Sequence, residues 1–164
     1  MPPKTRILRE DVLATAFQMI KEQSIDGLSA RNLAQRVGCS TQPIFSIFSS
    51  MEDCKTEVYW MAVNYMKDYM WEGVEKDGEV VEQLMQNYVS FASKEPNLFK
   101  AIFDSNCSAH NYNYMLEKLV DQGVGRDMLI YAHGLADIVA HSDDKCFGEE
   151  SEKCITYAHN KLEA

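Results

Sequence analysis

The sequence predicts an all-α protein of about nine helices, and two observations carry that prediction. Apolar residues recur three and four positions apart through most of the 164 residues, which is the spacing of one face of an α-helix. No run of alternating β-branched and polar residues lies between turn signals, as a half-buried strand would require. No apolar run approaches the roughly 18 residues of a membrane span, and five scattered cysteines argue against a secreted disulfide framework. We therefore expect a cytoplasmic protein with no membrane segment.

Helix signals divide the chain into nine predicted helices. Serines at positions 29, 40 and 50 can cap helices, and Gly27, Gly38, Gly78 and Gly123 mark turns. The predicted helices cover residues 9–23, 30–37, 41–48, 51–75, 80–93, 96–103, 114–123, 124–141 and 148–162. The basic residues before the first helix, up to Arg9, are expected to form a flexible arm.

The net charge of −9 is unevenly distributed along the chain. Residues 1–50 carry six basic and four acidic side chains, so the remaining residues carry an excess of eleven negative charges. A mildly basic N-terminal third joined to an acidic body is typical of a nucleic-acid-binding unit attached to a domain with another role. We expect two domains, at residues 1–50 and 51–164.

Two short helices joined by a tight turn form the most informative stretch. Gly38 can adopt a left-handed conformation where the first of them ends. Ala34, four residues earlier, is small enough to let the two helices approach. The second helix repeats apolar residues at the spacing of a buried face: Ile44, Ile47 and Phe48. Together these features indicate a DNA-binding helix-turn-helix.

The chain resembles the N-terminal domain of the TetR family of bacterial regulators over about residues 9–59. The resemblance lies in Leu28-Ser-Ala-Arg-Asn-Leu-Ala34 and in Val37-Gly-Cys-Ser-Thr-Gln-Pro-Ile-Phe45, followed by Phe48 and Ser50. It implies a three-helix DNA-reading head, a connector helix at residues 51–75, and a helical domain that binds a ligand and dimerises. Members of the family are mostly homodimeric repressors that a small ligand releases from DNA.

Three positions depart from the family pattern. Phe45 replaces the usual tyrosine, Ile47 replaces a frequent histidine, and Met51 replaces the usual lysine. Each change removes a phosphate contact worth about 1 kcal/mol or more. The alternative to a DNA-binding regulator is therefore a helical ligand-binding or interaction dimer with weak or lost DNA binding.

The DNA-facing residues follow from the apolar stripe of the second helix. That stripe should point inward, which turns Thr41, Gln42 and Ser46 outward. Gln42 can form two hydrogen bonds with adenine, and Thr41 can contact a thymine methyl group. Arg31 is placed to contact a phosphate. The candidate DNA-binding residues are Arg31, Thr41, Gln42, Pro43, Phe45 and Ser46.

The second half of the connector is crowded with large side chains that cannot share one stripe. Some should line a ligand cavity, since methionine and aromatic side chains adapt to varied ligands. Ordinary core packing is the alternative for each of them. The candidate pocket residues are Trp60, Tyr65, Met66, Tyr69, Met85, Tyr88, Phe99, Phe103, Met115 and Tyr131.

The predicted helix at residues 124–141 is apolar on two faces. One face can pack within its own domain and the other against a second subunit. This helix and the last one, at residues 148–162, resemble the pair of helices through which members of the family dimerise. Two such pairs would form a four-helix interface across a two-fold axis. The candidate interface residues are Ile130, His133, Gly134, Asp137, Ile138, Ile155, His159 and Leu162.

No known catalytic motif is present, and we expect neither an enzyme nor a cofactor. The histidines and cysteines near the C-terminus match no CxxC or HxxxH spacing, so packing is the favoured explanation for them: His133, His141, Cys146, Cys154 and His159. No metal site is therefore predicted. The expected partners are a palindromic DNA operator, a second copy of the chain and an unidentified small-molecule effector.

Overall fold

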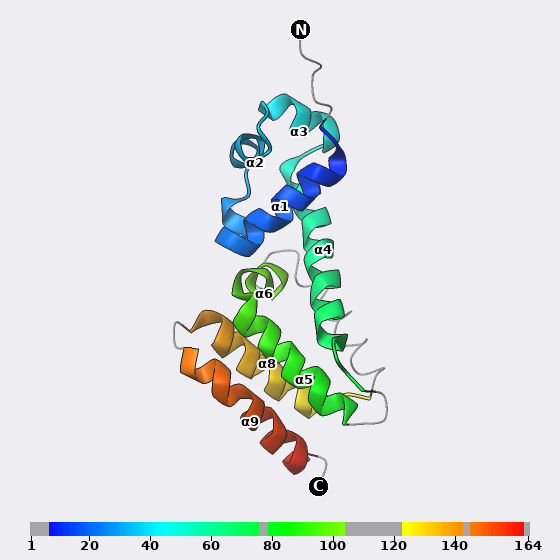
Figure 1. Cartoon of the computed structure of the whole chain (residues 1–164), viewed down its shortest axis with the longest axis vertical. Helices are drawn as coiled ribbons and strands as arrows, with labels where there is room; N and C mark the ends of the chain where they lie inside the picture. Colours follow the sequence, from blue (N-terminus) through cyan, green and yellow to red (C-terminus); the bar gives the residue numbers. More distant parts are fainter. Residues whose placement is uncertain (1–6, 76–78, 104–122, 143–144, 163–164) are drawn as a thin grey trace.

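The computed structural model describes residues 7–75, 79–103, 123–142 and 145–162, and every regular element in them is helical (Figure 1). This confirms the all-α prediction. The described residues form eight α-helices and one short 3-10 helix: α1 (Arg9–Gln23), η1 (Ile25–Gly27), α2 (Ala30–Val37), α3 (Thr41–Ile47), α4 (Met51–Trp71), α5 (Val80–Lys94), α6 (Pro96–Phe103), α8 (Arg126–His141) and α9 (Lys145–Leu162). Nearly all of the predicted helix at residues 114–123 lies outside them.

Helices α1, α2 and α3 form an N-terminal unit around a small apolar core. Val12, Ala16 and Ile20 of α1 are buried, as are Leu33 of α2 and Ile44 of α3. Helix α1 packs against α2, and α2 packs against α3. The inward face of the predicted helix-turn-helix therefore supplies the core, as the apolar spacing indicated.

Helix α4 links the N-terminal unit to the helices beyond it (Figure 1). It packs against α1 and also against α5 and α6. Cys54 and Val58 are fully buried, and Met66 and Met70 are buried further along the same helix. The helix is shorter than expected, because it ends at Trp71 and Gly73 then adopts a left-handed conformation with φ of +72°.

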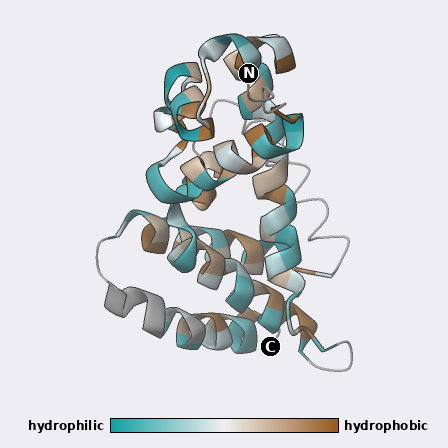
Figure 2. Cartoon of the chain, turned by 45° about the horizontal axis from the view of Figure 1, so that its top comes forward, coloured by the Kyte–Doolittle hydropathy of each residue, from teal (hydrophilic) through white to brown (hydrophobic). Residues whose placement is uncertain are grey.

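Helix α5 lies at the centre of the C-terminal helices. It packs against α4, α6, α8 and α9, and it buries Leu84, Met85 and Phe91. Figure 2 shows that these helices carry hydrophobic and hydrophilic residues on different sides, as amphipathic packing requires. Within the described residues, no helix has the length and apolar character needed to cross a membrane.

Candidate functional site

The turn between α2 and α3 is built by local capping. The Ser29 hydroxyl accepts a hydrogen bond from the backbone N–H of Asn32 at 3.2 Å, which caps α2. Gly38 ends that helix with φ of +80°, and the N–H of Cys39 donates to the carbonyl of Ala34 at 2.9 Å. Ala34 is buried. These contacts hold α3 at a fixed angle to α2.

Helix α3 has one buried face and one exposed face. Ile44 is fully buried, whereas Phe45 beside it is 54% exposed. Pro43 is partly buried. The exposed residues, which we call the α3 face, are Thr41, Gln42, Phe45 and Ser46. The Ser46 hydroxyl donates to the backbone carbonyl of Gln42 at 2.9 Å, so it is partly engaged within the helix.

Ser40 does not cap α3 through its side chain, contrary to expectation. It occupies the N-cap position with extended backbone angles, but its hydroxyl makes no capping hydrogen bond. The first turn of α3 therefore has no side-chain cap from this serine.

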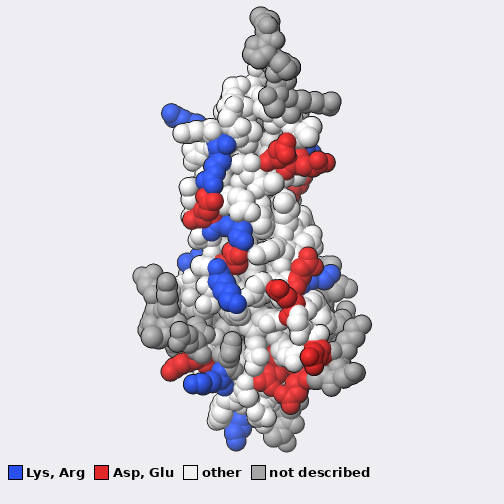
Figure 3. Space-filling view, viewed as in Figure 1, with Lys and Arg blue, Asp and Glu red and all other residues white. Residues whose placement is uncertain are grey.

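Charge around α3 is mixed rather than uniformly basic. Figure 3 shows basic side chains along one edge of the end of the molecule that holds α1–α3, with acidic side chains among them, and a further acidic group on the other edge. Arg36 forms an ion pair with Glu22 of α1 at 2.7 Å. Arg31 is exposed and forms no ion pair with any residue that the structure describes, so it can contact an anion.

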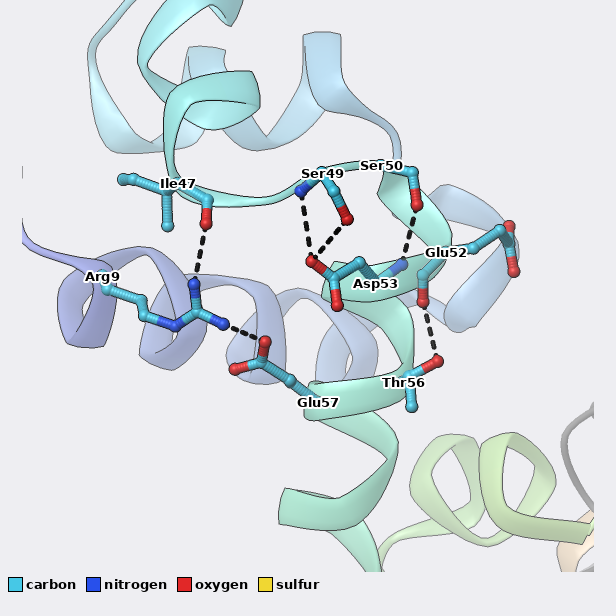
Figure 4. A network of polar contacts seen from close by, with 8 residues as sticks. All are labelled: Arg9, Ile47, Ser49, Ser50, Glu52, Asp53, Thr56 and Glu57. Atoms are coloured by element: carbon cyan, nitrogen blue, oxygen red, sulfur yellow. Dashed lines mark hydrogen bonds and ion pairs between the residues drawn. The ribbon is translucent and has the colours of Figure 1, made fainter.

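Arg9 is a structural residue and not part of a flexible arm, which corrects the prediction for this position. It is the first residue of α1, and its guanidinium donates to the carbonyl of Ile47 at 2.7 Å (Figure 4). The same group pairs with Glu57 of α4 and lies 4.7 Å from the ring centre of Phe48. Arg9 therefore ties the end of α3 to both α1 and α4.

The start of α4 is capped by two serines and an aspartate (Figure 4). The Ser50 hydroxyl accepts from the N–H of Asp53 at 3.1 Å, as the predicted cap requires. The Asp53 carboxylate accepts from the backbone N–H and the hydroxyl of Ser49, both at 3.1 Å. Two of the positions that depart from the family pattern, Ile47 and Met51, pack against the core here. Hydrogen bonds therefore fix the link between α3 and α4 at the end of α3, through Arg9, and at the start of α4, through Asp53.

A second polar contact joins the N-terminal unit to the C-terminal helices. Lys21 of α1 pairs with Glu95, between α5 and α6, at 2.6 Å, and Tyr65 of α4 donates to the same carboxylate at 3.2 Å. Partial burial lowers the pKa of Lys21, but hydrogen bonds with Glu95 and Tyr65 outweigh it, so the pKa is raised. Asn97 of α6 donates to the Lys21 carbonyl at 2.9 Å. We call these four residues the Lys21 contact.

The candidate pocket residues separate into two aromatic clusters. Around Phe91, the rings of Tyr65 and Tyr69 lie 6.1 and 5.5 Å from its centre. The second cluster joins Tyr88, Phe99 and Phe103 with His133, which corrects the prediction of that histidine at the dimer interface. The Tyr88 hydroxyl lies 2.7 Å from Nδ1 of that histidine.

The remaining candidate pocket residues lie elsewhere. Met66 and Met85 are fully buried in the core. Trp60 is 42% exposed, and its ring centre lies 5.5 Å from that of Tyr59. Tyr131 is 40% exposed on α8. Met115 lies outside the described residues. The prediction of a pocket in this region remains a prediction.

The candidate interface residues also fall into two groups. Ile130 is 71% exposed and Ile138 is 53% exposed, with exposed Gly134 and Asp137 between them on α8. Ile155 and His159 are buried within the chain instead. We define the α8–α9 face as the exposed apolar residues and glycine of these two helices: Ile130, Tyr131, Gly134, Ile138, Tyr157 and Leu162.

Tyr131 connects the two parts of this face. Its pKa is raised by partial burial and then by Cys154 and Tyr157 of α9, which lie beside it. Helices α8 and α9 run side by side (Figure 1). The exposed apolar side chains therefore occupy neighbouring helices.

Polar side chains join the first turns of α5 to the last turns of α9. Thr156 and Gln86 both donate to Oε1 of Glu82. Hydrogen bonds with Thr156 and Glu79 lower the pKa of Glu82, with help from His159 and against the effect of burial. Sequence reasoning missed this group because its members come from helices far apart along the chain.

Comparison with known proteins found a likeness in structure but not in sequence. No protein-family model matches the chain, and no curated protein matches it in sequence. It is similar to a solved structure of a TetR family protein from Vibrio parahaemolyticus, described there as a proposed transcriptional regulator. The match covers 92% of this chain and 97% of that one, with a TM-score of 0.60 and 23% sequence identity. The chain therefore has the fold of a TetR family protein.

Proposed function

We propose that this protein is a DNA-binding transcriptional regulator that reads duplex DNA with the α3 face. The observation that carries the proposal is the division of α3 into a buried apolar face and an exposed face of hydrogen-bonding side chains. An α-helix fits the major groove, where each base pair presents a distinct pattern of donors and acceptors. The fold shared with a TetR family protein supports the same assignment.

Different residues would carry sequence reading and backbone contact. Gln42 can form two hydrogen bonds with adenine, and Thr41 can bond a base edge or touch a thymine methyl group. The exposed ring of Phe45 lacks a hydroxyl for phosphate but offers an apolar surface to a thymine methyl group. Arg31 would contact a phosphate, which orients the protein without reading sequence.

The regulator would act as a homodimer joined through the α8–α9 face. Ile130, Gly134 and Ile138 are spaced four residues apart and form one exposed stripe of α8. Apolar side chains exposed this strongly on neighbouring helices favour burial against another protein surface. A two-fold axis through this face would present two α3 helices to a palindromic operator. Such a regulator would work in the cytoplasm, on the cell's DNA.

We further propose that the protein is a repressor released by a small ligand. The aromatic cluster around His133 offers both apolar surface and a polar pair for a ligand to engage. Phe99 and Phe103 belong to α6, and the Lys21 contact joins the start of α6 to α1. A ligand that binds more tightly to one position of α6 would therefore favour one position of the N-terminal unit. The ligand would then change the affinity for DNA by the same factor by which DNA changes the affinity for the ligand.

The alternative is a dimer that binds a ligand or protein and holds DNA weakly. The mixed charge around α3 and the apolar side chains at positions 45, 47 and 51 favour it. Phosphate contacts supply much of the affinity of a DNA-binding protein, so few cationic residues imply weak binding.

Fluorescence anisotropy with duplex DNA from upstream of the protein's own gene distinguishes these two functions. We expect tighter binding to that duplex than to a shuffled duplex of equal length and composition, with affinity that falls as salt rises. Equal affinity for both duplexes over the whole salt range would favour the alternative.

A further inference from the structure

Three metal-ligating side chains meet where α5 begins and α9 ends. Glu79 precedes the first residue of α5, Glu82 lies in its first turn, and His159 lies in the last turn of α9. One ligand atom from each residue lies within 4.8 Å of the other two. Glu82 and His159 are each only 8% exposed, whereas Glu79 is open to solvent. The cluster is therefore mostly enclosed but can be reached from one side.

The buried carboxylate of this cluster, that of Glu82, is held in place by neighbouring polar groups. Gln86 donates to Oε1 of Glu82 at 3.0 Å, and the Thr156 hydroxyl donates to the same oxygen. Thr156 also accepts from Gln86 at 3.3 Å. Hydrogen bonds of this kind orient the carboxylates of protein metal sites, so one candidate ligand is already positioned.

Charge in the cluster favours an added cation. Two carboxyls face a single imidazole, and Glu79 forms a hydrogen bond with Glu82, so the pair must share either a proton or a cation at this separation. A protonated imidazole would balance only one of them. A divalent ion bound by all three groups would offset both negative charges.

We propose that Glu79, Glu82 and His159 bind a divalent transition-metal ion, with Zn²⁺ as the best match. Zinc is bound in proteins by histidine nitrogen and by aspartate or glutamate oxygen, and open zinc sites have three protein ligands with water in the fourth position. Imidazole favours Zn²⁺ over Mg²⁺ and Ca²⁺, and among the common divalent ions the site would prefer Zn²⁺ to Mn²⁺.

The geometry requires only a modest contraction. Ligands about 2.1 Å from a tetrahedral zinc ion lie about 3.4 Å from one another. The three ligand atoms lie within 4.8 Å, and exposed Glu79 has room to move toward the other two. A bound ion would fasten the last turn of α9 to the first turn of α5. This site is independent of the proposed DNA binding.

Calorimetric titration of the full chain with ZnCl₂, after removal of bound metal with EDTA, tests the proposal. We expect one zinc site, with affinity weakened at least about tenfold by Glu79→Gln and by His159→Gln. Matched controls make the same changes elsewhere: Glu150→Gln on the exposed surface of α9 and His141→Gln on the exposed end of α8. Both controls should bind zinc as the original chain does.

Cobalt substitution excludes the five cysteines of the chain as the source of binding. Co²⁺ at the proposed site should give visible d–d bands without the near-ultraviolet charge-transfer band of a cobalt–thiolate bond, since the ligands are oxygen and nitrogen. Zinc should also raise the melting temperature of the original chain by more than it raises that of the Glu79→Gln variant at the same zinc concentration.

Three results would overturn the proposal. They are absence of zinc binding by the original chain, undiminished binding by Glu79→Gln, and a thiolate band with Co²⁺. Each would leave the cluster as a hydrogen-bonded contact between two helix ends. If His159→Gln fails to fold, Glu79→Gln decides the question, because Glu79 is exposed.

Discussion

The α3 face and the α8–α9 face expose different kinds of side chain. The α3 face presents a threonine, a glutamine and a serine around one exposed aromatic ring, Phe45. The α8–α9 face presents isoleucines, tyrosines and a leucine, with Gly134 among them. Polar side chains suit a partner that offers hydrogen-bonding edges, as duplex DNA does. Apolar side chains gain most from burial against another protein surface.

The two faces also differ in how the chain supports them. Helix α3 is short, and its orientation depends on the contacts of Arg9, Ser29 and Gly38. Helices α8 and α9 are long and both pack against α5. A reading surface that must meet base edges at a set angle needs such fixed geometry, whereas an apolar interface needs mainly area. The following variants test this division, from the largest expected effect to the smallest.

Replacement of Ile44 by alanine should cost about 2–5 kcal/mol in free energy of unfolding. Ile44 is fully buried in α3, and its truncation leaves a cavity in the N-terminal core. Urea denaturation followed by circular dichroism measures the loss. The control is Phe45→Ala on the exposed face, which should stay within about 0.5 kcal/mol. Equal losses for both variants would mean that the two faces of α3 are wrongly assigned.

Replacement of Ile138 by glutamate should raise the dissociation constant of the dimer by about 100-fold or more, because a charge would be buried at the interface. Sedimentation at several concentrations measures it. Phe45→Glu is the matched control, since Phe45 is 54% exposed and Ile138 is 53% exposed. That control should leave the dimer intact but weaken DNA binding. A dimer unaffected by Ile138→Glu would move the interface away from this face.

Replacement of Gln42 by alanine should cost about 1–3 kcal/mol of binding at the preferred sequence and relax the preference there. Arg31→Ala should instead weaken binding to all duplexes alike. It should also reduce the slope of log affinity against log salt concentration by about one for each N-terminal unit that binds. Anisotropy with a panel of singly substituted duplexes separates the two effects. Identical profiles for both variants would contradict the proposed division between base and phosphate contacts.

Replacement of Lys21 by methionine should cost about 1 kcal/mol of stability. Because the pKa of Lys21 is raised by its partners, its contribution is complete below its ordinary pKa of 10.5 and is lost as pH rises through the higher folded value. Thermal unfolding of both proteins from pH 7 to 11.5 should show their difference shrinking at the top of this range. Arg36→Ala, which removes an exposed ion pair, should change stability little at any pH.

Local signals predicted the N-terminal elements well. The predicted ranges of α1 and α2 coincide with the observed helices, because the Ser29 cap and the Gly38 turn act on adjacent residues. Helix α4 ends at Trp71, four residues before the predicted end, because the chain turns at Gly73 and not at the later break predicted near Gly78. Helix α9 begins at Lys145, three residues earlier than predicted.

Contacts between distant segments could not be predicted in the same way. The apolar stripe that includes Ile44 fixes the rotation of α3, so the exposure of Thr41 and Gln42 followed from the sequence. The roles of Arg9 and Lys21 depend on partners in other helices, such as Glu57 and Glu95. Spacing along one helix carries no information about such partners.

Selection from a pool of random duplexes tests the central claim most directly. The full chain should enrich one palindromic sequence whose half-sites lie about one helical turn apart, and Gln42→Ala should enrich a more varied set. This result would show that the α3 face reads bases. Enrichment of no sequence at low salt, by a chain shown to be folded and dimeric, would contradict the account.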